Sequence, residues 1–288
     1  MITATVRPTD EQLALLSPFE RRTFDLVDFV NRNRLAKAAT GAFLRSGGMG
    51  WVYYCTRNLM HLVGFERLKR LRPERGLIIA SNHRSFFDLY VVCCWLFRET
   101  DLLKRLYFPV RSDFFYQTPV GVFVNLVMSA WSMYPPVFRE PEKRSFNDFG
   151  LKRLIELLQQ SGSVVGMHPE GTRGKGSDPY QLGRAQPGIG KLIVEAKPEV
   201  VPIFIHGLGN DLPKQVWGNF DGSGPPVIIV AGDPLDLSPY YQRRNSLRVQ
   251  KEIADHVVEA IQQLGPRERS LREQLERDPR CGPLSYPG

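Results

Sequence analysis

Short apolar runs alternate with helical segments from about residue 65 to residue 265. Apolar runs of about four to eight residues are typical of buried strands, whereas apolar side chains spaced three or four apart are typical of helices. The expected strands are 77–80, 106–110, 163–167, 200–205 and 226–230. The expected helices are 86–97, 146–159, 188–196 and 245–264. Strands separated by helices predict an α/β fold with a mostly parallel, twisted sheet flanked by helices.

Residues 1–64 have a different, helical pattern. Ser17-Pro18 is typical of a helix start. The apolar residues that recur after it at helical spacing are Phe19, Leu26, Phe29 and Val30. We therefore expect an N-terminal helical segment over 1–64, an α/β domain over 65–265 and a C-terminal tail over 266–288 that begins as a short helix.

The longest charge-free stretch runs from Phe114 to Phe138 and is long enough to cross a bilayer. Polar residues and prolines, including Pro135 and Pro136, interrupt this stretch. We therefore expect an element of the protein core rather than a transmembrane helix, with immersion in a membrane interface as the alternative. No apolar run of signal-peptide length precedes Glu20, so no secretion signal is expected.

Composition narrows the class of protein. The chain has 288 residues, of which 24% are charged and 42% hydrophobic, so a disordered chain is excluded. The net charge of +8 favours an anionic partner such as a phosphorylated metabolite, an acidic membrane surface or nucleic acid. The 4 cysteines form no CxxC pair and are too few for a disulfide scaffold, which favours a reducing compartment.

A histidine and an aspartate lie where the strand 77–80 gives way to the next helix. His83 is expected at the carboxyl end of a strand, where parallel sheets bind ligands. Asp88 follows five residues later, near enough to hold His83 as a general base. Ser85 to Asp88 also matches a helix capping box, so Asp88 has a purely structural alternative.

A second group of polar residues follows the expected strand 163–167. The segment 168–176 combines glycines with Arg173 and Lys175, which suits a phosphate ligand. It matches neither a Walker loop nor a zinc deaminase, and the chain has no zinc-protease motif or nucleophile elbow. The alternative is a surface turn with solvated charges. Arg139 ends the charge-free stretch and is a third candidate for binding an anion.

Taken in order, these residues resemble the glycerolipid acyltransferase family, which includes the lysophosphatidate acyltransferases. Residues 82–88, NHRSFFD, match the NHx4D motif of that family, and residues 169–173, PEGTR, match a second motif. Val201-Pro202 and Arg139 fall where the family has two further motifs. The likeness covers about residues 66–265.

The resemblance implies roles for particular residues. His83 would take a proton from the acceptor hydroxyl, supported by Asp88. The acceptor site would be formed by Glu170, Gly171, Thr172 and Arg173, and the phosphate would be held by Arg173 and Arg139. Two features depart from the family. The arginine motif contains two prolines, and His168 replaces the aromatic residue before Pro169, which brings a second imidazole close to His83.

The implied reaction is acyl transfer from an acyl thioester to a lysophospholipid hydroxyl in phospholipid synthesis, with 1-acylglycerol 3-phosphate as the leading acceptor. No metal or tightly bound cofactor is implied, since acyl-CoA or acyl carrier protein is a substrate. Other lysolipid, lipid amino acid or glycolipid acceptors remain open, as do a thioesterase and a non-catalytic lipid-binding protein. Nucleic acid is not expected, because aromatic residues do not alternate with the basic ones.

The resemblance also implies a membrane partner. We expect peripheral or monotopic binding at the cytoplasmic face of a membrane through residues 18–63. The basic residues expected beside the apolar side chains of this segment are Arg32, Arg34, Lys37, Arg45 and Arg57. Anionic lipid would attract such a surface, although a solvated basic face is the alternative.

Overall fold

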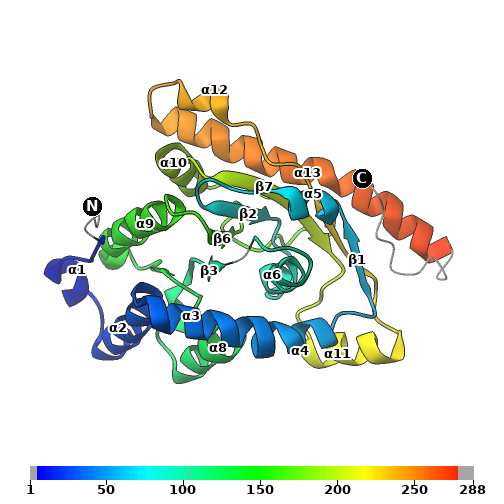
Figure 1. Cartoon of the computed structure of the whole chain (residues 1–288), viewed down its shortest axis with the longest axis horizontal. Coiled ribbons are helices and arrows are strands. Elements are labelled where there is room, and N and C mark those ends of the chain that lie inside the picture. Colours follow the sequence, from blue (N-terminus) through cyan, green and yellow to red (C-terminus); the bar gives the residue numbers. More distant parts are fainter. Residues whose placement is uncertain (1–4, 103, 278–288) are drawn as a thin grey trace.

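The central feature of the computed structural model, which describes residues 5–102 and 104–277, is a six-stranded sheet (Figure 1). Its strand order is β1-β8-β7-β2-β6-β3, and a short two-stranded sheet pairs β4 with β5. The strands are β1 (Met60–Val63), β2 (Leu77–Ser81), β3 (Arg105–Tyr107), β4 (Val110–Arg111), β5 (Pro136–Val137), β6 (Ser163–Met167), β7 (Glu199–His206) and β8 (Val227–Ala231). Within the large sheet every neighbouring pair is parallel except β7 and β8. The predicted mostly parallel α/β fold is therefore confirmed.

Helices precede, connect and follow these strands. The helices are α1 (Asp10–Ala14), α2 (Pro18–Arg32), α3 (Arg34–Phe43), α4 (Met49–Tyr54), α5 (Phe65–Arg70), α6 (Asp88–Glu99), α7 (Ser112–Phe115), α8 (Pro119–Ser129), α9 (Arg144–Leu158), α10 (Pro187–Ala196), α11 (Leu212–Asp221), α12 (Ser238–Tyr241) and α13 (Leu247–Arg277). A π-helical turn, Leu44–Gly48, joins α3 to α4, and a 3₁₀ turn, Pro141–Lys143, precedes α9.

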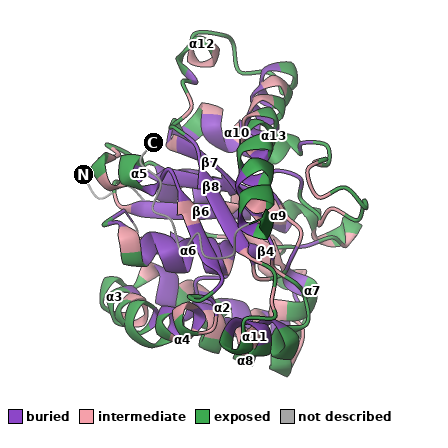
Figure 2. Cartoon of the chain, turned by 90° about the vertical axis from the view of Figure 1, so that its right-hand side faces the viewer, coloured by how far each residue is buried: buried purple, intermediate pink, exposed green. Residues whose placement is uncertain are grey.

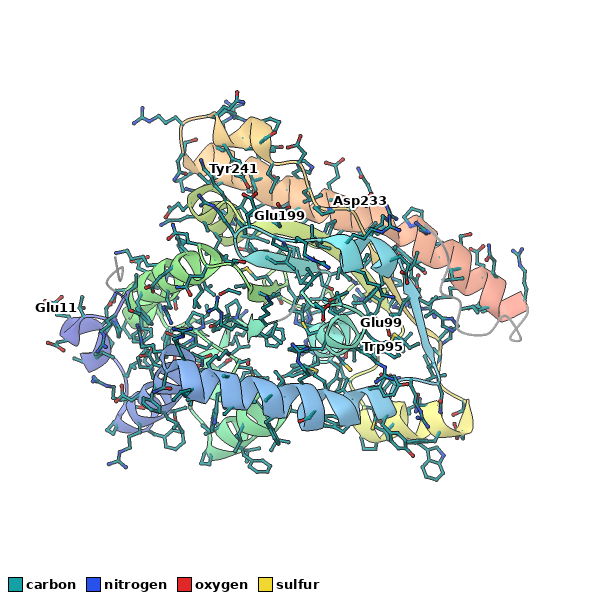
Figure 3. All side chains as sticks on the ribbon, in the orientation of Figure 1. Glu11, Trp95, Glu99, Glu199, Asp233 and Tyr241 are labelled. Atoms are coloured by element: carbon teal, nitrogen blue, oxygen red, sulfur yellow. The ribbon has the colours of Figure 1, made fainter. Side chains whose placement is uncertain are left out.

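The large sheet is covered on both faces, and its strands are almost wholly buried (Figure 2). Successive side chains of a strand point to opposite faces of the sheet. In β2, Ile78 and Ala80 accordingly join an apolar cluster with α9, α10 and α13, whereas Leu77 and Ile79 join a second cluster with α4 and α6. Side chains such as Trp95 of α6 fill the space between the sheet and its helices (Figure 3). Burial on both faces explains why these strands are continuous apolar runs.

The N-terminal segment forms one side of the molecule. Helix α2 begins as predicted, because Ser17 and Glu20 form a reciprocal capping box at its N-terminus. The predicted common face of α2 is divided, since Phe19 and Phe29 are exposed whereas Val30 is buried. The segment is also not wholly helical, because residues 60–63 form β1 and pair with β8.

Lys37 does not contribute to a basic surface, contrary to the prediction. Its ammonium group is buried and donates hydrogen bonds to Oδ1 of Asn31 at 2.8 Å, the Leu106 carbonyl at 2.8 Å and Oγ of Ser132 at 3.2 Å. Burial lowers the pKa of Lys37 to about 7. This lysine therefore fastens α3 to β3 rather than binding lipid.

Two further elements differ from the sequence prediction. Helix α13 does not end near residue 264 but continues through Pro266 to Arg277, so the predicted boundary at 265/266 lies within one helix. A proline within an apolar run indicates an edge strand or the lip of a pocket, yet β7, which contains Pro202, lies between β2 and β8. The carbonyl of Pro202 faces the β8 side, where it accepts from Gly232 N, and the β7–β8 ladder begins only at Ile203. The position without an N–H donor therefore falls at the end of the β7–β8 ladder.

No helix within residues 5–102 or 104–277 has the length and apolar character needed to cross a membrane. Helix α8, which occupies the middle of the charge-free stretch, ends at Ser129.

Candidate active site

His83, Asp88 and the segment 168–173 lie where β2, β6 and β7 end at the same edge of the sheet, whereas Arg139 follows β5 of the small sheet. Ala80 is paired with Met167 in register, so the segments that follow β2 and β6 emerge side by side. The Asn82 amide fixes the first of these segments to β7, because it donates to the Ile205 carbonyl and accepts from Ile205 N, both at 2.8 Å. The strand ends thus hold the NHx4D and PEGTR segments against one another.

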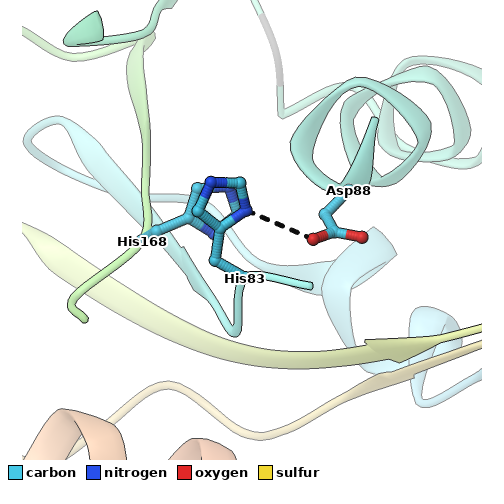
Figure 4. A group of neighbouring side chains, drawn as sticks. All are labelled: His83, Asp88 and His168. Carbon is cyan, nitrogen blue, oxygen red and sulfur yellow. Dashed lines mark hydrogen bonds and ion pairs between the residues drawn. The ribbon is translucent and has the colours of Figure 1, made fainter. Parts of the chain in front are cut away.

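The imidazole of His83 lies beside the carboxylate of Asp88, the first residue of α6 (Figure 4). Nδ1 of His83 is 3.3 Å from Oδ2 of Asp88. A carboxylate only accepts hydrogen bonds, so Nδ1 carries the proton and the lone pair is on Nε2. An imidazole in this tautomer can accept a proton at Nε2, and the carboxylate stabilises the imidazolium that forms. The pair therefore has the arrangement of a general base.

Asp88 also organises the turn before α6. Its Oδ2 atom accepts hydrogen bonds from the backbone N–H groups of Arg84 and Ser85, each at 2.7 Å. Only half of the capping box expected from the sequence forms, because Ser85 Oγ accepts from Phe87 N rather than from Asp88 N and α6 has no side-chain cap. Asp88 thus has a structural role in the turn together with its contact to His83. Burial raises the pKa of Asp88 to about 6. Burial, followed by the charges of Arg173 and Arg111, lowers the pKa of His83 to about 4. At neutral pH the pair consists of a carboxylate and a neutral imidazole.

His168 lies against His83, as expected of a second imidazole in this motif. The two rings are stacked, with centroids 3.8 Å apart and planes 7° from parallel (Figure 4). Nδ1 of His168 is 2.9 Å from the carbonyl oxygen of Ser81. A carbonyl cannot donate, so Nδ1 of His168 carries a proton. Burial, followed by the charge on His83, lowers the pKa of His168 to about 4.

Glu170 is buried and both of its carboxylate oxygens are occupied by backbone groups. Oε1 accepts from His83 N at 3.0 Å, and Oε2 accepts from Gly183 N at 2.6 Å. Burial raises the pKa of Glu170. Glu170 therefore ties the His83 turn to the segment that closes the loop after β6. Gly171 follows with φ +67°, a conformation that disfavours other residues.

Arg173 and Arg111 act electrostatically on His83, and Arg139 acts on Arg111. Burial, and then the charge of Arg139, lowers the pKa of Arg111, and Arg173 contributes in the same direction. The guanidinium of Arg173 lies 3.7 Å from the ring centroid of Phe86. Arginine charges this near to one another create a positive potential that suits an anionic ligand.

Arg111 was missed by the sequence analysis. Arg111 directly follows the expected strand 106–110. A basic residue at the carboxyl end of a predicted strand could have indicated its place near the site. The structure divides that run into β3 and β4 and brings Nη2 of Arg111 to 3.5 Å from the carbonyl oxygen of Gly171. Thr172 is exposed at the surface of the same loop.

The stacked histidines are poorly arranged for holding a metal ion. His83, Asp88 and His168 offer ligand atoms that all lie within 4.8 Å of one another. Ring-nitrogen lone pairs lie in the plane of an imidazole, so those of two parallel stacked rings do not converge on a point between them. The Nδ1 atoms of both rings are also occupied, by Asp88 and Ser81. The arrangement suits proton transfer better than metal coordination.

An apolar cavity of about 20 Å³ lies behind the start of α6. Its lining comes from α4, α6, α8, α11 and the segment before α11, and includes Phe87, Tyr90 and Met128. Phe87 directly precedes Asp88, so the cavity adjoins the turn that carries the His83–Asp88 pair.

The fold and this pair of motifs define the class of protein. The family model described as Acyltransferase matches residues 62–206, half of the chain, and the chain belongs to this acyltransferase family. Among solved structures, it is similar to the 1-acyl-sn-glycerophosphate (LPA) acyltransferase PlsC from Thermotoga maritima. That match has a TM-score of 0.46 and 17% sequence identity, and covers 82% of this chain and 86% of the PlsC chain. No curated protein matches the chain.

Proposed function

We propose that this acyltransferase moves a fatty acyl group from acyl-CoA or acyl carrier protein to the hydroxyl of 1-acylglycerol 3-phosphate, in phospholipid synthesis. One observation carries the proposal: a neutral imidazole with its lone pair on Nε2 is held by a buried carboxylate next to Arg111 and Arg173. This combination supplies a base for a hydroxyl and positive charge for a phosphate in the same place.

In the proposed reaction, Nε2 of His83 removes the proton of the acceptor hydroxyl as its oxygen attacks the thioester carbonyl. The carbon–oxygen bond forms, the carbon–sulfur bond breaks, and the thiolate leaves. The proton on His83 then passes to the thiolate sulfur, so the enzyme returns to its starting state. Asp88 stabilises the transient imidazolium through Nδ1. No covalent acyl-enzyme is needed.

Binding of the acceptor phosphate is assigned to Arg173, Arg139 and Arg111. Guanidinium groups pair with phosphate oxygens through two parallel hydrogen bonds. Glu170 and Gly171 shape this site indirectly, because they fix the course of the loop that carries Thr172 and Arg173. The acyl chain is assigned to the apolar side chains around α8, next to the cavity behind Phe87.

We also propose that the enzyme binds a membrane surface, and the burial pattern of α8 supports this. Its small and polar residues Gly121, Asn125 and Ser129 are buried, whereas Val120 and Phe123 are 65% and 64% exposed. A helix at a protein–water boundary normally has the opposite orientation. Apolar side chains that point outward in this way suit contact with lipid.

Neighbouring helices continue this apolar surface. Helices α2, α3, α8 and α11 lie on the same side of the molecule (Figure 1). We use the name apolar face for their exposed large hydrophobic residues, which are Phe19, Leu26, Phe29, Leu35, Phe43, Val120, Phe123, Leu126, Val127, Leu212, Trp217 and Phe220. Trp217 of α11 is 71% exposed, and Tyr54 and Phe220 are in contact, with ring centroids 5.2 Å apart. The guanidinium of Arg57 lies over Tyr54. Aromatic residues beside arginines suit the boundary between lipid tails and anionic headgroups.

These features support peripheral or monotopic binding to a membrane, which we propose takes place at its cytoplasmic face. The cysteines of the described residues, Cys55, Cys93 and Cys94, are free thiols.

The test is thiol release from an acyl-CoA or acyl carrier protein by the purified protein, with and without 1-acylglycerol 3-phosphate. We expect release that depends on the acceptor and yields the diacyl product. His83→Ala should lower kcat at least about a thousandfold, because it removes the base. Glu142→Ala, on the 3₁₀ turn before α9, serves as the control variant.

Other results would redirect the proposal. Thiol release without an acceptor would indicate a thioesterase. Product formed with another lysolipid, a lipid amino acid or a glycolipid, but not with lysophosphatidate, would keep the chemistry and change the acceptor. Full activity in His83→Ala would refute the mechanism.

A further inference from the structure

The stacked pair of His83 and His168 has a geometry that the proposed reaction does not by itself require. The rings come from the ends of two neighbouring parallel strands, β2 and β6, and overlap with centroids 3.8 Å apart (Figure 4). The ring of His168 is held by a hydrogen bond of its own, because its Nδ1–H donates to the carbonyl of Ser81, the last residue of β2. The ring behind His83 is thus attached to the strand that carries His83.

The contact with Asp88 does not restrain the tilt of the His83 ring. At 3.3 Å, the distance between Nδ1 and Oδ2 lies beyond the usual range for such a bond, and Oδ2 already accepts two bonds at 2.7 Å. A single hydrogen bond fixes the direction of Nδ1 but permits the ring to tilt about that direction. A ring stacked against its face opposes this tilt, because tilting would separate the planes or press them together. The two contacts restrain different motions.

The protonation state of His168 is compatible with this role. Its pKa of about 4 keeps the ring neutral near pH 7, so it adds no positive charge beside His83. Its single Nδ1–H is bonded to the Ser81 carbonyl and does not compete for Asp88.

We propose that His168 is a positioning residue, whose ring, anchored to Ser81, holds the His83 imidazole in the plane that directs Nε2 at the acceptor hydroxyl. The inference rests on the proposed role of His83 as the base. It distinguishes two parts of His168: the ring face, which positions His83, and the Nδ1–H, which only anchors the ring.

Two substitutions separate these parts. His168→Phe keeps a ring in the stack and loses the donor to Ser81. His168→Asn keeps an amide donor near the position of Nδ1 and loses the ring. We expect kcat to fall about tenfold in His168→Asn, with KM for both substrates within about twofold, and to stay within about threefold of the wild type in His168→Phe.

A second measurement does not depend on activity. In the full-length protein, ¹⁵N-histidine NMR should show the Nδ1 proton of His83, shifted downfield by Asp88, in the wild type and in His168→Phe. The signal should broaden or disappear in His168→Asn, while His83→Ala identifies it. Failure of the wild type to transfer an acyl group would refute the proposed function and leave this signal as the test of the stack.

Two outcomes would overturn the inference. Wild-type kcat in His168→Asn, with the His83 signal intact, would mean that the stack does not position the base. A loss of activity in His168→Phe as large as that in His83→Ala, with the His83 signal intact, would mean that a nitrogen of His168 takes part in the chemistry. Thermal unfolding of each variant shows whether it is folded under assay conditions.

Discussion

At the scale of single residues, Asp88 combines two tasks that sequence analysis had treated as alternatives. It accepts backbone hydrogen bonds from Arg84 and Ser85, which closes the turn before α6, and it also faces Nδ1 of His83. The turn that presents His83 and the carboxylate that supports it therefore depend on the same side chain. A substitution of Asp88 should affect both the local structure and the base.

The pKa values of this pair predict a pH dependence. His83 is faced by Asp88 of α6, by Arg111 of β4, and by His168 and Arg173 from the loop after β6. At pH 7 Asp88, with a pKa of about 6, is charged, and His83, with a pKa of about 4, is neutral. As the pH falls through about 6 the pair takes up a proton and the support for Nδ1 is lost. We therefore expect kcat/KM to be constant above this pH and to decline below it.

Asp88→Asn provides the control for this pH profile. Its activity should be low, because an amide cannot stabilise the imidazolium of His83 as a carboxylate does. The inflection near pH 6 should be absent, because the carboxyl group that takes up a proton at that pH is gone. An unchanged inflection in Asp88→Asn would assign the titration to another group.

Arg111 belongs to the same scale, since its role in phosphate binding can be tested alone. We expect Arg111→Ala to raise KM for lysophosphatidate by about ten- to a hundredfold, because one charge-assisted contact with the phosphate is lost. A monoacylglycerol acceptor, which lacks the phosphate, should be used equally well by variant and wild type. Arg248→Ala, on the exposed surface of α13, is the control. Equal losses with both acceptors would argue against a phosphate contact.

At the scale of elements, the end of α13 fastens the loop that follows β6. Glu268 is fully buried and accepts from the Tyr180 hydroxyl at 2.6 Å and from Nη2 of Arg272 at 2.5 Å. Tyr180 belongs to the loop that also carries Arg173. The residues past 265 that lie within α13 thus have a structural task at the edge of the candidate site.

This contact predicts a loss of stability. We expect Glu268→Ala to lower the free energy of unfolding by about 3 kcal/mol, because it leaves the partly buried Arg272 without its carboxylate. Glu273→Ala, which removes the exposed partner of Arg277 on the same helix, should change it by less than about 0.5 kcal/mol. Chemical denaturation measures both. Equal stability of the two variants would show that the buried contact contributes little.

At the scale of the whole molecule, the apolar face and helix α13 lie on opposite sides of the sheet (Figure 1). The apolar face combines α2 and α3, which precede the sheet, with α8 and α11. Helix α8 lies within the segment matched by the family model, and α11 lies after it. Membrane contact would therefore involve more of the chain than residues 18–63.

This arrangement predicts a difference between two exposed apolar positions. Phe123→Asp on α8 should weaken binding to anionic liposomes at least about tenfold, because it places a charge in the apolar face. Leu247→Asp, at an 80% exposed leucine at the start of α13, should bind like the wild type. Flotation of the full-length protein measures both. Equal binding of Phe123→Asp and the wild type would exclude α8 from the membrane contact.

The sequence by itself determined the central strands of the fold and the chemistry of the motifs. Buried parallel strands must be continuous apolar runs, and β2 and β6 could be recognised for that reason. Residues that follow such strands must meet at one edge, which brought His83 and the segment 168–176 together in the prediction.

Only the tertiary structure decided which side chains share a surface. The buried ammonium of Lys37, the outward apolar side chains of α8 and the place of Arg111 beside Arg139 depend on contacts between distant segments. Periodicity shows that a helix has one apolar and one polar face, but not which of them packs against the rest of the protein. In water the apolar face packs inward, whereas at a membrane it can face the lipid. The stacking of His168 on His83 likewise follows from the register of β2 with β6, which no local pattern encodes.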